Sequence, residues 1–171
     1  MLPDPLHPAL VHLPLALAVL TPALALLAML AMRLGFLPAR TWGAIVLLQA
    51  LMLGSAWAAQ ETGEAEEERA LRVVAERHIE DHEEAAERFL GLAAAALLVS
   101  AAGCLSGRWG RAARYATLAA GVAVLAAGLA VGHSGGELVY RHGAAAAYTE
   151  SANHPEAPTT RPVSGGSAEG R

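Results

Sequence analysis

Histidines are the side chains of this sequence that are best suited to bind a metal ion or a haem. The chain has seven of them and a single cysteine. Neutral imidazole is the commonest metal ligand in proteins, and haem b commonly takes its axial ligands from histidines on facing helices. His78 and His82 are four residues apart, as are His133 and Glu137, so each pair shares one face of a helix. Helices that bring such pairs together would form a binding site for a metal ion or a haem.

Composition places the chain in a membrane. Of its 171 residues, 54% are hydrophobic and only 16% are charged, against about 25% charged in a typical soluble domain. This excludes a disordered chain, and the lone cysteine excludes a disulfide scaffold. The net charge of −4 and the absence of lysine argue against a nucleic-acid partner. An integral membrane protein, with the lipid bilayer as its partner, remains.

Four apolar segments could cross that bilayer. Residues 13–32, 42–59, 89–106 and 115–132 contain 18 to 20 residues each and no charged side chain. A bilayer core of about 30 Å needs about 20 helical residues. The loops between the first two segments and between the last two are short, which favours antiparallel neighbours. We therefore predict an all-α membrane domain over residues 1–143, an up-down-up-down bundle of four transmembrane helices.

The long connection, residues 60–88, is an acidic arm that holds eleven of the sixteen acids. It has no proline or glycine between Glu64 and Glu87. We predict one helix that continues into the third span and extends it well outside the membrane. Residues 144–171 are rich in alanine, serine and glycine and are predicted to be a disordered tail.

Arginines predict the orientation. The two short loops and their flanks hold Arg33, Arg40, Arg108, Arg111 and Arg114 and no acid. Because arginine in short loops marks the cytoplasm, both termini are predicted to lie on the outer, periplasmic side of the inner (cytoplasmic) membrane. In this topology all seven histidines lie at the outer end of the bundle.

The outer end is therefore the predicted site. We predict that His12, His82 and His133 converge there as cofactor ligands, with room provided by the small residues Gly132 and Gly136. Further metal ligands are expected close behind, namely His7, His78, Glu137 and His142. The alternative is that these histidines are unrelated side chains facing lipid headgroups.

Two end motifs carry a family resemblance. The segment HPALVHLP at residues 7–14 resembles the HPxxVHFP opening of the bacterial membrane family called domain of unknown function 2231. The segment GHSGGELVYRHG at residues 132–143 is similar to its GxxGGxLVYxHG closing motif. Leu13 stands where the family usually has phenylalanine, and the arm is unusually acidic. The family is similar in hydropathy to small b-type cytochromes, and some relatives are joined to iron–sulfur domains. The resemblance therefore implies a redox protein as a partner.

Three functions are compatible with these features. The first is a haem-binding electron carrier that meets a redox protein partner. The second is a non-haem site for a transition metal ion such as zinc, copper or iron. The third is a non-catalytic membrane module that assembles with partners through the acidic arm, and a homo-oligomer is also compatible with the sequence. No nucleophile triad or phosphate loop is present to indicate an enzyme reaction.

Overall fold

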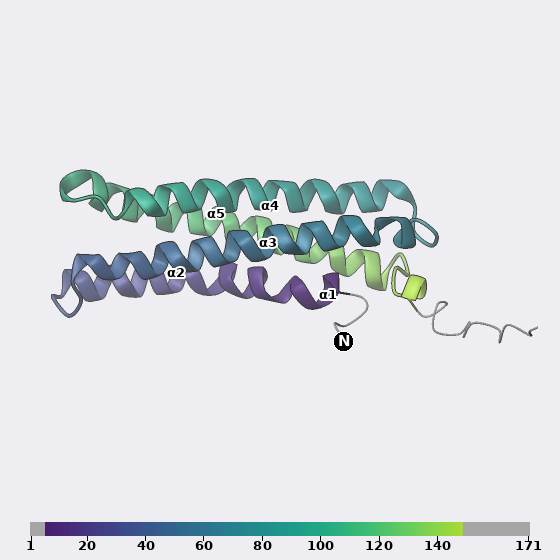
Figure 1. Cartoon of the computed structure of the whole chain (residues 1–171), viewed down its shortest axis with the longest axis horizontal. Helices are drawn as coiled ribbons and strands as arrows, with labels where there is room; N and C mark the ends of the chain where they lie inside the picture. Colours follow the sequence, from purple (N-terminus) through teal and green to yellow (C-terminus); the bar gives the residue numbers. More distant parts are fainter. Residues whose placement is uncertain (1–5, 149–171) are drawn as a thin grey trace, which may run out of the picture.

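The computed structural model describes residues 6–148; residues 1–5 and 149–171 lie outside the described part of the chain. Within it the chain is all-α (Figure 1). A single turn, α1 (His7–Leu10), leads into α2 (His12–Arg33), and a short 3-10 turn, η1 (Ala39–Trp42), leads into α3 (Gly43–Ala70). The last two long helices are α4 (Glu76–Ala102) and α5 (Gly107–Tyr140).

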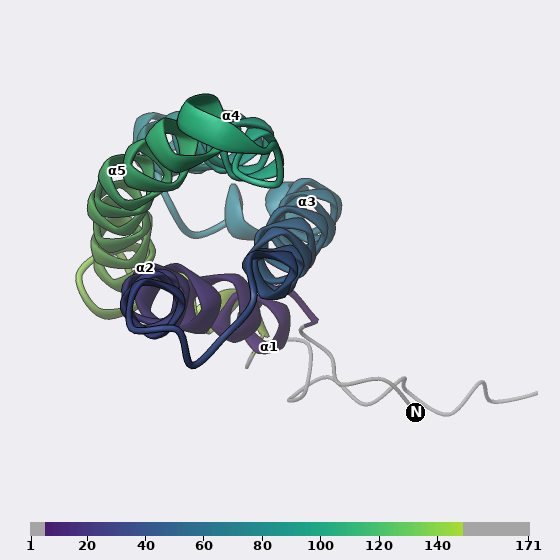
Figure 2. The ribbon, with the colours of Figure 1, turned by 90° about the vertical axis from the view of Figure 1, so that its left-hand side faces the viewer.

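The four long helices form a bundle whose neighbours run in opposite directions (Figures 1 and 2). Each is long and apolar enough to cross a membrane, which confirms the predicted bundle of four long apolar helices. Large apolar side chains point outward from them; Leu98 is 74% exposed and Leu129 is 66% exposed. Because exposed apolar surface is unfavourable in water, these helices are suited to lie in a lipid bilayer.

Small side chains fill the interior of the bundle. Ala18, Ala93 and Ala96 are at most 2% exposed and pack around Phe89 and Met52. At one crossing, a methyl group on Gly121 of α5 would lie 3.1 Å from the Cβ atom of Pro22 of α2. Small residues let membrane helices approach closely, so the alanine-rich sequence allows the four helices to pack tightly.

The acidic arm is not one helix, and this part of the prediction was wrong. Helix α3 continues beyond its apolar segment to Ala70, the chain turns over residues 71–75, and α4 begins at Glu76. A straight helix would leave Val74 and Ile79 in water. The turn instead buries them, to 5% and 6% exposure, and apolar burial stabilises the hairpin. The extension outside the membrane is therefore shared between α3 and α4.

The predicted tail begins too early in the sequence. Gly143, with φ of 73°, reverses the chain after α5, a conformation that favours glycine. Ala147 is then 6% exposed, and the hydroxyl of Tyr148 donates a 2.7 Å hydrogen bond to Glu66 Oε2. Residues 144–148 thus belong to the folded domain, and the remainder of the predicted disordered tail, 149–171, lies outside the described residues.

Candidate functional site

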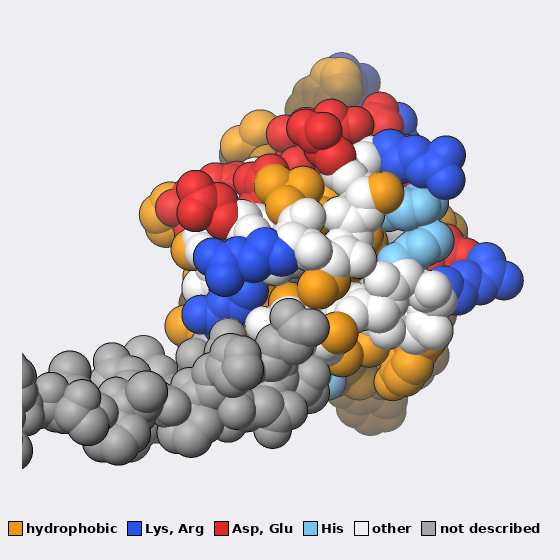
Figure 3. All heavy atoms as spheres, turned by 90° about the vertical axis from the view of Figure 1, so that its right-hand side faces the viewer, with side chains coloured by type: hydrophobic (Ala, Val, Ile, Leu, Met, Phe, Trp, Pro, Cys, Tyr) orange, Lys and Arg blue, Asp and Glu red, His pale blue; other side chains and the backbone are white. Residues whose placement is uncertain are grey.

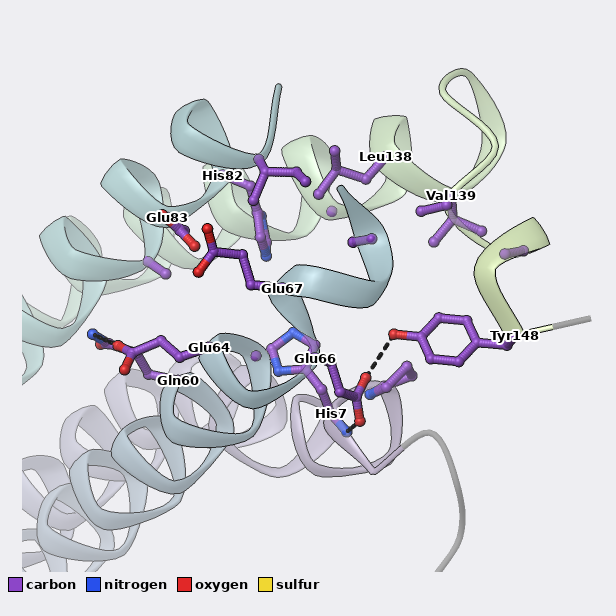
Figure 4. Close-up of a pocket in the computed structure, with 18 of the residues that line it drawn as sticks. His7, Gln60, Glu64, Glu66, Glu67, His82, Glu83, Leu138, Val139 and Tyr148 are labelled. Carbon is purple, nitrogen blue, oxygen red and sulfur yellow. Dashed lines mark hydrogen bonds between the residues drawn. The ribbon is translucent and has the colours of Figure 1, made fainter. Parts of the chain in front are cut away.

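A cavity of about 680 Å³ opens at the end of the bundle that carries the α3–α4 turn. Residues from α1, α3, α4, α5 and the segment after α5 line it (Figure 4). Acidic side chains gather over this end of the molecule (Figure 3). Five of them reach the cavity lining: Glu64, Glu66, Glu67, Glu83 and Glu87. We call this space the acidic cavity.

Two histidines from different helices face one another in the acidic cavity. His7 comes from α1 and His82 from α4, and their rings extend toward each other (Figure 4). The ring centroids are 6.3 Å apart and the planes are nearly perpendicular, at 86°. Two imidazoles at this separation are close enough to interact with a single small ligand.

Hydrogen bonds fix the same tautomer in both rings. The Nδ1 atom of His7 lies 2.7 Å from the carbonyl oxygen of Ala59, an acceptor, so Nδ1 carries the proton. The Nδ1 atom of His82 lies 2.8 Å from Ser134 Oγ. The hydroxyl of Ser134 already donates to the carbonyl of Val131, at 3.1 Å, so it accepts from His82. In the neutral form of both rings, the Nε2 atoms therefore keep a lone pair that has no partner among residues 6–148, the arrangement typical of metal-ligating histidines.

Glycines make room for both rings. A methyl group on Gly63 would lie 3.1 Å from Nδ1 and Cε1 of His7, and one on Gly135 would lie 3.2 Å from Cε1 of His82. Gly132 and Gly136, which the sequence suggested for this purpose, have nothing within 4 Å of such a methyl group. The glycines that lie close to the histidine rings are therefore at two positions that the sequence analysis did not select.

Burial favours the neutral form of His82. Desolvation, followed by the nearby charge of His7, lowers the pKa of His82 below its ordinary value. The carboxyl group of Glu83 has a raised pKa, because of desolvation first and then the surrounding glutamates, of which Glu67 has the largest effect. The cavity therefore combines a neutral imidazole with crowded carboxylates whose mutual repulsion a bound cation would relieve.

Gln60 adds an acceptor without a partner to this lining. Its Nε2 atom donates to Glu64 Oε1 at 3.1 Å. Its Oε1 atom is buried and has no hydrogen-bond partner in the described part of the chain. A buried polar atom left without a partner is costly, so a cation or a hydrogen-bond donor in the cavity would stabilise this side chain.

Glu66 ties together the three segments that surround the cavity. Its Oε1 atom accepts the backbone N–H groups of Leu6, at 2.9 Å, and His7, at 3.3 Å. Its Oε2 atom accepts the Tyr148 hydroxyl, and the Arg69 guanidinium lies over the Tyr148 ring. One carboxylate of α3 therefore positions both the turn that carries His7 and the segment that follows α5.

The remaining predicted ligands lie elsewhere. His12 is exposed, with Nδ1 3.4 Å from the carbonyl of Ala9. The side chain of His133 is 77% exposed and lies 3.7 Å from Glu137, which is also paired with Arg141. Neither histidine lines the acidic cavity, so the structure does not bring the predicted triad of His12, His82 and His133 together there.

His78 and His142 form a separate pair. Their rings stack with centroids 3.7 Å apart and planes at 18°, which connects the first turn of α4 to the residues after α5. Nowhere in residues 6–148 do three side chains of the histidine, cysteine or acidic types come close enough to hold a metal ion together. Any ion in the acidic cavity would thus begin from the His7–His82 pair.

Sequence reasoning missed several residues of this site: Gln60, Gly63, Glu66, Ser134, Gly135 and Tyr148. Only Gly135 and Ser134 carried a signal, because they lie within the closing motif at residues 132–143. The others contact the histidines or the cavity from distant points in the chain, and no local pattern marks them.

Comparison with known proteins does not assign the chain to a family. No family model, no curated protein and no solved structure matches the chain. The resemblance of the two end motifs to a known membrane family therefore stays a prediction. In space, the motifs do meet: His7 of the first and Gly135 of the second both line the acidic cavity.

Proposed function

We propose that this chain is a multi-pass protein of the inner (cytoplasmic) membrane that binds a transition-metal cation in the acidic cavity, with His7 and His82 as nitrogen ligands. The observation that supports the proposal most directly is that Nδ1 of each ring is hydrogen-bonded, at 2.7 Å to the Ala59 carbonyl and at 2.8 Å to Ser134 Oγ, so that in the neutral rings Nε2 is the atom available to a metal. Neutral imidazole suits zinc, copper, nickel and iron.

The spacing of the rings is compatible with one shared ion. Metal–nitrogen bonds of about 2.0–2.1 Å place two imidazoles on opposite sides of an ion with centroids about 6 Å apart. The observed 6.3 Å is close to that value. A tetrahedral ion would draw the rings together slightly. Water would complete its coordination, because no third histidine, cysteine or acidic side chain of residues 6–148 lies close enough.

Haem b, the first expectation from the sequence, fits this cavity less well. The ring separation suits two axial ligands, but a haem also brings two propionates. Among the described residues that line the cavity there are five glutamates and no arginine, so propionates would meet like charges instead of cationic partners. The lining thus favours a bare cation over a haem.

A metal titration of the full-length protein in nanodiscs tests the proposal. Zn²⁺, Ni²⁺ and Cu²⁺ are added in turn, and the bound metal is measured after gel filtration. The His7→Ala/His82→Ala variant should bind more than about 100-fold more weakly, since even loss of outer-shell partners costs about 10–100-fold. The His12→Ala/His133→Ala variant removes two exposed histidines of the same end and should bind like the parent protein.

Two outcomes would overturn the assignment. Loss of binding in His12→Ala/His133→Ala, but not in His7→Ala/His82→Ala, would move the site to the exposed histidines. A Soret band in the purified protein that disappears in His7→Ala/His82→Ala would replace the cation by haem. Ser134→Ala is a milder variant for the case that the double alanine variant does not fold. It removes only the acceptor of His82 Nδ1 and should weaken metal binding about 10–100-fold.

The single cysteine offers a test of the proposed orientation, in which both termini and the acidic cavity lie on the periplasmic side of the membrane. Cys104 is exposed at the end of the bundle opposite the acidic cavity. A membrane-impermeant maleimide should leave it unlabelled in intact spheroplasts and label it in inverted vesicles. Arg72→Cys in a Cys104→Ala background places a thiol in the α3–α4 turn and should give the opposite pattern. Labelling of Cys104 from outside would reverse the proposed topology.

A further inference from the structure

At the end of the bundle opposite the acidic cavity, the charged side chains of the described residues are all positive. No aspartate or glutamate occurs in residues 7–60 or 88–136. The loops of this end and their flanks carry five arginines: Arg33, Arg40, Arg108, Arg111 and Arg114. We call it the arginine end. The carboxylates of the described chain all lie toward the other end, so nothing here neutralises these charges.

A hollow of about 490 Å³ lies among these arginines. It is formed where η1 meets the loop between α4 and α5, and its lining includes Arg40, Arg111 and Arg114. A concave surface with three guanidinium groups fits an anion, and guanidinium in particular suits phosphate, which it can bind with two parallel hydrogen bonds.

The three arginines have different roles. Arg114 is engaged within the protein: its Nε donates to the carbonyl of Gly103 at 2.8 Å, and its guanidinium lies over the Trp42 ring. It holds the α4–α5 loop against η1. The side chains of Arg40 and Arg111 are exposed and make no ion pair or hydrogen bond with residues 6–148. These two guanidinium groups are therefore free to bind a ligand.

Exposed apolar side chains lie at the same end of the bundle as the hollow. Phe36 is 78% exposed, Trp109 is 67% exposed and Leu105, which also lines the hollow, is 57% exposed. Tryptophan and other large apolar residues beside arginines are typical of the boundary between headgroups and acyl chains. They place the hollow at the depth of the lipid phosphates.

We infer that Arg40 and Arg111 form a phosphate site that binds the headgroup of an anionic phospholipid. The phosphate contacts the two guanidinium groups, and the acyl chains lie along the apolar surface beside Phe36 and Leu105. Basic pockets of this kind on the cytoplasmic side of membrane proteins bind anionic headgroups. This inference is independent of the metal site, because the two sites lie at opposite ends of the bundle.

Native mass spectrometry of the full-length protein tests the inference. Protein is reconstituted with mixtures of phosphatidylglycerol and phosphatidylcholine, and the retained lipids are counted. The parent protein should retain phosphatidylglycerol preferentially. Arg40→Gln/Arg111→Gln should lower that preference about tenfold or more, as expected on loss of charge-assisted hydrogen bonds. Arg33→Gln removes one charge from the same end without touching the lining of the hollow and should keep the preference.

Further variants and a competition experiment with inorganic phosphate distinguish a lipid headgroup from free phosphate. Arg40→Lys/Arg111→Lys retains both charges and should recover part of the preference, because lysine still attracts the phosphate but cannot bind it with two parallel hydrogen bonds. An equal loss in Arg33→Gln would overturn the inference in favour of diffuse attraction. Unchanged retention in Arg40→Gln/Arg111→Gln would also overturn it. Displacement of phosphatidylglycerol by millimolar inorganic phosphate would overturn the lipid assignment and indicate a site for free phosphate.

Discussion

Acidification is expected to weaken metal binding to the acidic cavity steeply, by up to about 100-fold per pH unit. Each imidazole must be neutral to ligate a metal, so each protonated histidine contributes a limiting slope of about tenfold per pH unit. An unperturbed histidine titrates near pH 6.5. Because burial and His7 lower the pKa of His82, His82 should resist protonation longer, and the two-proton slope should appear only at the acidic end of the titration.

Calorimetric titration with Ni²⁺ over a series of pH values would measure this slope. His82→Gln leaves one imidazole in the cavity and should halve the logarithmic slope. A pH-independent affinity would contradict ligation by histidine. Without metal, the lowered pKa has its own consequence: the unfolded chain takes up a proton first, so the free energy of unfolding should fall as the pH drops below about 6.5, by at most about 1.4 kcal/mol per pH unit.

The fold was predictable from the sequence because a bilayer sets the length of a spanning helix. Residues 13–32 and 115–132 contain no charge, and their only prolines are Pro14 and Pro22. Long apolar segments of this kind predict helices that can span a bilayer. The turn at residues 71–75 was not predictable in this way. It contains no glycine or proline, and what favours it is the burial of Val74 and Ile79 against other helices, a tertiary effect that helix propensity does not report.

The site was predictable only in part. Topology alone placed all the histidines at one end, and His7 and His82, which were both among the predicted ligands, do line the acidic cavity. Which histidines pair depends on the orientation of α1 and of the first turn of α2. Pro8 and Pro14 interrupt the regular helical periodicity of these two segments. That orientation turns His7 toward α4 and leaves His12 exposed. Helical spacing could not distinguish the two.

Replacing Gly110 by alanine is expected to destabilise the arginine end by about 3 kcal/mol, at the upper end of the range for overpacking. A methyl group at Gly110 of α5 would collide with the carbonyl oxygen of Leu105 and lie 2.7 Å from the carbonyl carbon. These are backbone atoms of the α4–α5 loop and cannot rotate away as a side chain could. Thermal unfolding of the detergent-solubilised protein would measure the loss.

The matched control is Gly91→Ala in the middle of α4, where nothing lies within 4 Å of the added methyl group. Alanine favours a helix over glycine by about 1 kcal/mol, so this variant should be as stable as the parent or slightly more stable. The same chemical change thus has opposite signs at two helical glycines. Because Leu105 lines the arginine hollow, Gly110→Ala should also reduce phosphatidylglycerol retention. Equal unfolding temperatures for the two variants would contradict the close contact between α5 and this loop.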